Sequence, residues 1–97
     1  MLIIFQNEAD LLADKIKDNF NKHYKNLSLQ ITYDISNDLL RGMNIILHDN
    51  INKYSENKYV SVMEFGHVNR LIEYIVEIVI LKLFDKLVDN TYRKATS

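Results

Sequence analysis

The sequence predicts a small α/β (α+β) protein. A single-layer sheet of about three strands is covered on one face by helices, and a long helix ends the chain. Residues 27 to 35 alternate between apolar and polar side chains, which is typical of a half-buried strand. Residues 7 to 26 and 67 to 90 repeat their apolar side chains at helical spacing. We expect one domain, spanning residues 1 to 97.

The N-terminal segment begins with a short apolar run, "LIIF" (Leu2 to Phe5), which we expect to form an edge or buried strand. An amphipathic helix is predicted directly after it, because apolar positions recur at steps of three and four residues. Asn7 can cap this helix, and Glu8 and Asp10 suit the positive end of its dipole. The recurring positions are Ala9, Leu12, Ile16, Phe20 and His23 or Tyr24.

The stretch "LSLQITYDI" (residues 27 to 35) is predicted to be a strand with one face on the core and one face in water. We expect Leu29, Ile31 and Tyr33 to be buried. Gln30 and Thr32 are expected to be exposed. The polar face indicates that helices cover only one side of the sheet.

Residues 38 to 54 fit two structures. As a helix capped by Ser36 or Asn37, they place most of their apolar side chains in one arc about 140° wide. As a strand, "MNIILH" places Met43, Ile45 and Leu47 on one face, with Gly42 in the preceding turn. We favour the helix, because more apolar positions fit it. Those positions are Leu39, Leu40, Met43, Ile46, Leu47, Ile51 and Tyr54.

A further strand is expected at "KYVSVMEF" (Lys58 to Phe65), ended by Gly66, with the last helix beginning near His67. The element order is then strand, helix, strand, helix, strand, helix. If residues 43 to 48 are a strand instead, the order becomes strand, helix, three-stranded meander, helix.

The most apolar stretch is "RLIEYIVEIVILKLFDKLVD" (residues 70 to 89). A membrane span needs about 20 mostly apolar residues, and Glu73, Glu77 and Lys82 interrupt this run. In a uniform helix, its apolar face would rotate by more than about 100° near residue 80. The second face would be explained by a kink, by cover from the chain's other helices, or by cover from another protein chain. A kink has neither Pro nor Gly here to cause it. The candidate interface is formed by Ile80, Leu81, Phe84, Leu87 and Val88.

The sequence shows no pattern typical of a catalytic, metal or cofactor site. His23, His48 and His67 each lack a second histidine at ligand spacing. The serines lack the glycine-flanked turn of a hydrolase nucleophile, and two isolated glycines do not form a phosphate loop. Glu73 and Glu77 lie one turn apart, as on any soluble helix. We therefore expect no enzymatic activity, no cofactor and no metal ion.

Charge and composition narrow the range of partners. A net charge of −1 creates no field that would attract nucleic acid or an acidic membrane. Asp10, Asp14 and Asp18 interleave with the lysines of the first helix, as on a salt-bridged solvent face. Because the chain has no cysteine and no basic signal-peptide region at its start, we expect a cytoplasmic location. Abundant Ile, Asn, Lys, Tyr and Phe correspond to A/T-rich codons, typical of a low-GC bacterium or its phages and plasmids.

Together these observations favour a small non-enzymatic protein-binding module that docks on a partner protein. Accessory or inhibitor proteins of a phage or mobile element are of this kind. The alternative is a self-associating structural protein, a homodimer whose last helix pairs across a two-fold axis. Nucleic-acid binding is less favoured, and we expect no membrane association.

Overall fold

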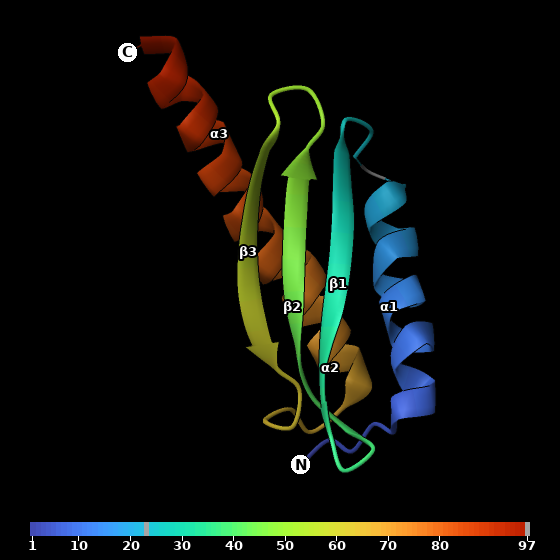
Figure 1. Cartoon of the computed structure of the whole chain (residues 1–97). Helices are drawn as coiled ribbons and strands as arrows, with labels where there is room; N and C mark the ends of the chain where they lie inside the picture. The colour runs from blue at the N-terminus through green and yellow to red at the C-terminus, as the bar shows by residue number, and fades with distance from the viewer. Residues whose placement is uncertain (23, 97) are drawn as a thin grey trace.

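The computed structural model shows an N-terminal helix, a three-stranded antiparallel sheet and a long C-terminal helix (Figure 1). It describes residues 1–22 and 24–96, with backbone alone for 91–96; His23, which the sequence pattern placed on the first helix, lies outside the described residues. The elements are α1 (Gln6–Asn21), β1 (Leu27–Ser36), β2 (Leu39–Asp49), β3 (Tyr54–Ser61), α2 (Val68–Tyr74), the π-helical turn η1 (Ile75–Val79) and α3 (Ile80–Thr96). The predicted fold class is confirmed, since helices pack against one face of this sheet.

The sheet is an antiparallel meander in the order β1-β2-β3. Ser36 pairs with Leu39, so that Asn37 and Asp38 alone connect β1 to β2. These two residues have φ angles of 53° and 63°. Positive φ at both central positions is the geometry of a type I′ hairpin turn, and Asn and Asp tolerate it better than most residues. The turn therefore sets β2 antiparallel to β1.

The helix that we favoured for residues 38 to 54 is wrong. The segment forms the central strand β2, and Met43, Ile45 and Leu47 are buried on its inner face as the strand alternative required. Asn37 forms the hairpin turn instead of a helix cap, and Gly42 lies inside the strand. Local periodicity favoured the helix because β2 also carries an apolar residue, Ile46, on its outer side. Pairing with β1 and β3 satisfies the backbone of β2 on both sides.

The N-terminal run Leu2 to Phe5 does not form the expected strand. Its one bridge joins Phe5 to Leu39, and the Leu40 N–H donates a hydrogen bond to the Ile4 carbonyl at 2.8 Å. Asn7 is not the helix cap, because α1 already begins at Gln6. The Glu8 carboxylate instead accepts a hydrogen bond from the Phe5 N–H at 3.4 Å.

The strand predicted at residues 27 to 35 is confirmed as β1. Ile31 is buried, Gln30 and Thr32 are exposed, and Leu29 and Tyr33 are half-buried rather than fully buried. The difference follows from position, because β1 is an edge strand with α1 beside it (Figure 1). The alternation continues to Ser36, while the pairing with β2 shifts by one residue between Asp34 and Ile35.

The third strand begins and ends about four residues earlier than the predicted range Lys58 to Phe65. β3 pairs from Tyr54 to Ser61, opposite Asp49 to Gly42 of β2. The residues that follow it form a loop, and the last helix begins at Val68 with His67 at its N-cap position, close to where it was expected. Polar residues such as Asn57 lie on the solvent-exposed face of β3, and they weaken the apolar pattern from which a strand is predicted.

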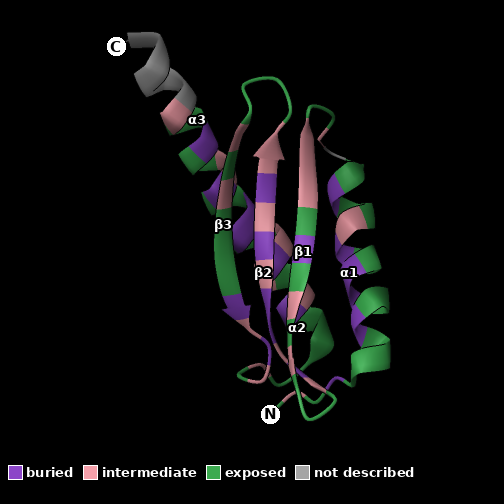
Figure 2. Ribbon diagram, in the orientation of Figure 1, coloured by how far each residue is buried: buried purple, intermediate pink, exposed green. Residues whose placement is uncertain are grey.

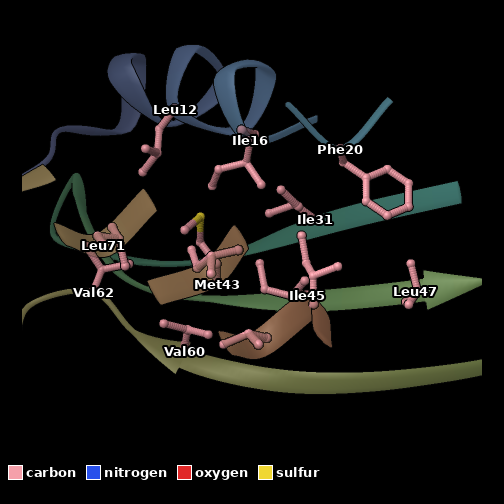
Figure 3. Close-up of a cluster of buried hydrophobic side chains, with 14 of the residues drawn as sticks. Leu12, Ile16, Phe20, Ile31, Met43, Ile45, Leu47, Val60, Val62 and Leu71 are labelled. Atoms are coloured by element: carbon pink, nitrogen blue, oxygen red, sulfur yellow. The ribbon is translucent and has the colours of Figure 1, made fainter. Parts of the chain in front are cut away.

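One apolar layer lies between the sheet and the helices. Figure 3 shows Leu12, Ile16 and Phe20 of α1 pointing toward side chains of β1 and β2, and Figure 2 shows buried residues on the helix surfaces that face the sheet. The last helix adds Leu71, Ile75, Val79, Ile80, Leu83 and Leu87 to this layer. All the side chains that are buried among the described residues are apolar, so hydrophobic burial dominates the stability of the fold.

The π-helical turn η1 explains the rotation of the apolar face near residue 80. In a uniform α-helix, the six buried side chains of the last helix would spread over about 180°. A π turn holds one extra residue between hydrogen-bonded groups. This extra residue turns Ile80, Leu83 and Leu87 back toward the sheet, and one face of the helix then carries all six. None of the three explanations drawn from the sequence included a π turn.

Deletion of Ile78 tests this account. The deletion removes one exposed residue from the π turn and leaves apolar spacings of four, three, one, three and four residues. These spacings fit one face of a regular α-helix about 100° wide. The variant is expected to fold, with a free energy of unfolding within about 1 kcal/mol of the parent, as measured by urea denaturation.

Deletion of Lys82 is the matched control. The deletion shifts the residues on one side of position 82 by about 100° around the helix axis. If the C-terminal part shifts, Leu83 and Leu87 leave the buried face, and if the N-terminal part shifts, Ile80 leaves it. The expected loss is at least about 2 kcal/mol, since burial of one such side chain contributes about 1.5–3 kcal/mol. Equal destabilisation by the two deletions would contradict the proposed role of the π turn.

Candidate protein-binding surface

The five side chains of the predicted interface separate into two groups. Ile80 and Leu87 are only 1% and 2% exposed and belong to the core against the sheet. Leu81 and Val88 are 48% and 51% exposed, and Phe84 is half-buried. The surface open to a partner is therefore formed by Leu81, Phe84 and Val88, which we call the outer stripe of α3.

The outer stripe follows helical geometry. Its members are separated by three and four residues, so they lie on one side of α3. The neighbouring Lys82, Asp85 and Lys86 are exposed and form a charged border beside it. An apolar centre with a polar border is the usual composition of a protein interface.

An aromatic row connects the outer stripe to the core. The ring of Phe20, buried at the end of α1, stacks on Tyr24 with centroids 4.9 Å apart. Tyr24 in turn contacts Phe84 at 6.0 Å and an interplanar angle of 43°. Rings at these separations attract each other beyond their burial alone. The contact with Tyr24 therefore holds the Phe84 ring in place on its core-facing side.

A second exposed apolar region lies at the other end of the molecule. Met1, Ile3 and Leu11 are well exposed, and Val68 is partly so. Ile3, Leu11 and Val68 line a hollow of about 310 Å³ at the N-terminal segment and α1. Sequence reasoning missed this region because it assigned Leu2 to Phe5 to a strand.

The outer face of the sheet is almost entirely polar. Across the three strands, side by side, lie Ser28, His48 and Ser55, and in the next row Gln30, Ile46 and Asn57. His48 and Gln30 are hydrogen-bonded, with 3.2 Å between Nε2 and Oε1. This face has the composition of a solvated surface.

Tyr59 is the aromatic side chain on that polar face. Its hydroxyl crosses the central strand and donates a hydrogen bond to the Asp34 carboxylate at 2.7 Å. A Cβ at Gly42 would overlap the phenol of Tyr59, so the crossing requires glycine at that position. The bond to Asp34 is the main cause that raises the pKa of Tyr59 above its ordinary value. Sequence reasoning missed this contact because it depends on the register of β3.

Among the described residues, the candidate catalytic and metal-ligating side chains form no cluster that could hold a metal ion. Within residues 1–22 and 24–96, no three His, Asp or Glu side chains come together as metal ligands. The ring of His67 makes no capping hydrogen bond to α2. Glu73 and Glu77 are exposed on the last helix, and Ser55 lies on the wet face of the sheet. Absence of an activity stays a prediction.

Tyr33 forms the one strongly perturbed pair. Its hydroxyl donates a hydrogen bond to Asp10 of α1 at 2.8 Å. Burial, followed by this bond and the nearby charges of Asp10 and Asp14, raises the pKa of Tyr33 to about 12. The pair borders an open hollow of about 710 Å³ at the start of α1. It ties α1 to β1 and has no acid–base partner beyond that.

The Gly42→Ala substitution is expected to lower the melting temperature of the protein, whereas Gly66→Ala should change it little. The methyl group at position 42 would displace Tyr59 and break the bond to Asp34. Gly66→Ala is the control, because nothing lies within 4 Å of a Cβ there. Thermal melts of both variants measure the difference. If Gly66→Ala costs as much as Gly42→Ala, the steric explanation fails.

Stability is expected to fall as pH rises from about 10 to 12. Below the ordinary pKa of 10.0, Tyr33 is protonated in both folded and unfolded states; between 10.0 and about 12, the unfolded chain loses the proton first. Tyr33→Phe should flatten this alkaline decline. Urea midpoints of both proteins between pH 9 and pH 12 test it, and identical slopes would contradict the assignment.

No protein-family model matches the sequence, and no curated protein or solved structure matches the chain. Among the described helices, none is both long enough and apolar enough to cross a membrane. The outer stripe of α3 is the feature of the chain that most favours a binding function.

Proposed function

We propose that this chain is a non-enzymatic protein-binding module that docks on a partner protein through the outer stripe of α3. One observation carries the proposal: Leu81 and Val88 remain about half exposed at helical spacing, beside an aromatic anchor that the core holds in place. Single exposed apolar residues are common on soluble proteins, whereas an ordered stripe with a charged border is typical of a binding site.

The size of the stripe indicates how it binds. A stable interface buries about 800 Å² on each partner, and three side chains of one helix supply only part of that area. A groove that encloses the helix would cover the stripe and its charged border together, as in helix-in-groove recognition. Flat pairing of two α3 helices would bury less. Docking on a different protein is thus favoured over the homodimer, which remains the alternative.

The biological setting is part of the proposal. The small size and the abundance of residues with A/T-rich codons support an accessory or inhibitor protein of a phage or mobile element in a low-GC host. A chain without cysteine suits the reducing cytoplasm. Inhibition by such a protein requires only occupation of a partner's surface, for which no catalytic group is needed.

The double variant Leu81→Asp, Val88→Asp tests the proposal. Both side chains are exposed, so the melting temperature should change little, whereas partner affinity should fall at least about tenfold, as for interface hot spots. A photo-crosslinking amino acid at position 81 in the source cell identifies the partner, and titration calorimetry then compares the variants. Phe84 is left intact because it also contacts Tyr24.

Leu11→Asp is the matched control, since Leu11 is 63% exposed on α1, away from the stripe. Equal loss of affinity in the control and in the double variant would contradict the assignment of the surface. Light scattering tests the alternative: a dimer at low micromolar concentration that the double variant converts to monomer would establish self-association in place of docking.

A further inference from the structure

A different surface is formed by the outer edge of β3 and the loop that follows it. In the part of the chain that the structure describes, β3 has a strand neighbour on one side only, β2. A hollow of about 470 Å³ lies along the second half of the strand, between Lys58 to Ser61 and the side chains of Phe65 and Tyr74. A free strand edge beside a side-chain pocket is the arrangement that strand-addition sites use for peptides.

The hollow has an aromatic wall. The rings of Phe65, in the loop after β3, and Tyr74, at the end of α2, lie with centroids 5.4 Å apart and an interplanar angle of 50°. Both are half-buried against the core, so they are held in place with one side accessible. Accessible aromatic rings can bind an apolar chain or the cation at its end.

Carboxylates surround the aromatic wall on its other side. Phe65 and Tyr74 also border an adjoining hollow of about 500 Å³, together with Glu64, Glu73 and Glu77. Arg70 lines this hollow and Lys58 lines the other one, so the three carboxylates outnumber the two cations around the aromatic wall. Glu77 lies within the π turn η1, which sets its position on the helix. π turns occur often at functional sites.

We infer that the β3 edge binds an extended peptide segment of a partner protein by strand addition, with a lysine or arginine side chain of that segment placed between the aromatic pair and the three glutamates. The backbone of the peptide pairs with β3, its cation lies against Phe65 and Tyr74, and the carboxylates balance its charge. This site is separate from the outer stripe of α3 and does not depend on the proposed function.

A second copy of this chain fits the edge less well. If two β3 strands paired antiparallel over residues 54 to 61, the start of one strand would face the end of the other. In that register Glu56 of the copy would face Tyr59, and Lys53 of the copy would approach the end that carries Glu64. A second copy offers one lysine there but no extended segment that reaches the aromatic pair, and the exchange measurement below separates it from a basic peptide.

Titration of the ¹⁵N-labelled full chain with a defined probe tests the inference. The probe is an acetylated and amidated peptide of nine residues, alternating threonine and valine, with arginine at its centre. Binding should shift the amide signals of Lys58, Val60 and Tyr74. A twin with citrulline, an uncharged isostere, should bind about fivefold more weakly, and a twin with alternate backbone amides N-methylated should not bind.

Charge variants of the protein complete the test. Glu73→Gln, on an exposed residue that leaves the core intact, should reduce the preference for arginine over citrulline, whereas Asp18→Asn on α1 should leave it unchanged. The inference would be overturned if the arginine and citrulline peptides bound equally, or if the N-methylated peptide still bound. It would also be overturned by signal changes away from β3, or by no binding at millimolar peptide. If the protein is a dimer, and if its β3 amides lose protection from hydrogen exchange on dilution, then a second copy occupies the β3 edge in place of a peptide.

Discussion

The structure depends on the burial of one face of a three-stranded sheet beneath two helical segments. Without such cover the inner apolar face of the sheet would be exposed to water. α1 covers the side near β1, and the last helix crosses toward β3, so each strand contributes to one shared core. Because the buried side chains are apolar throughout the described residues, shape and register, rather than buried polar contacts, determine which face of each element points inward.

The π turn links this core to both candidate surfaces. The residue that it adds lets Ile75 and Leu87 face the sheet from the same side of one continuous helix. The same shift leaves Leu81 and Val88 outside and places Glu77 beside the aromatic pair of Phe65 and Tyr74. A π turn is less favourable than regular α-helix, and it persists here because the alternative would expose part of the core. The positions of both candidate surfaces are therefore consequences of a packing requirement.

The sequence predicts best where local pattern and tertiary structure agree. In β1, strict alternation identifies Ile31 as buried, because an edge strand with one wet face has to alternate. In β2, helical and strand periodicity overlap, and the deciding feature is the two-residue turn at Asn37 and Asp38. Asn and Asp are common both at helix caps and in hairpin turns, so only the pairing of the flanking strands decides between the two structures. The preference of Asn37 and Asp38 for a hairpin turn was the signal that the prediction missed.

The candidate interface was predictable only in part, for a similar reason. The sequence places Ile80 and Leu81 on one apolar face only if the helix is uniform, and nothing in the local residue types identifies a π turn, since neither Pro nor Gly is present. The apolar spacings still contained the information. In a uniform helix the apolar positions after residue 80 fall about 100° away from those before it, and one extra residue in a π turn brings the two sets onto one face.

The polar face of the sheet shows how a sheet without cover on one side can still be ordered. The Tyr59 hydroxyl passes over Gly42 to reach Asp34, and so joins the two edge strands across the central one. This contact lies close to the bulge at Asp34 and Ile35, where the ladder is interrupted. Because the Tyr59 side chain is exposed, water competes for both partners of this hydrogen bond and weakens it. Placed at this interruption, the tie restrains β3 against β1 on the wet side, while Val60 anchors β3 on the buried side.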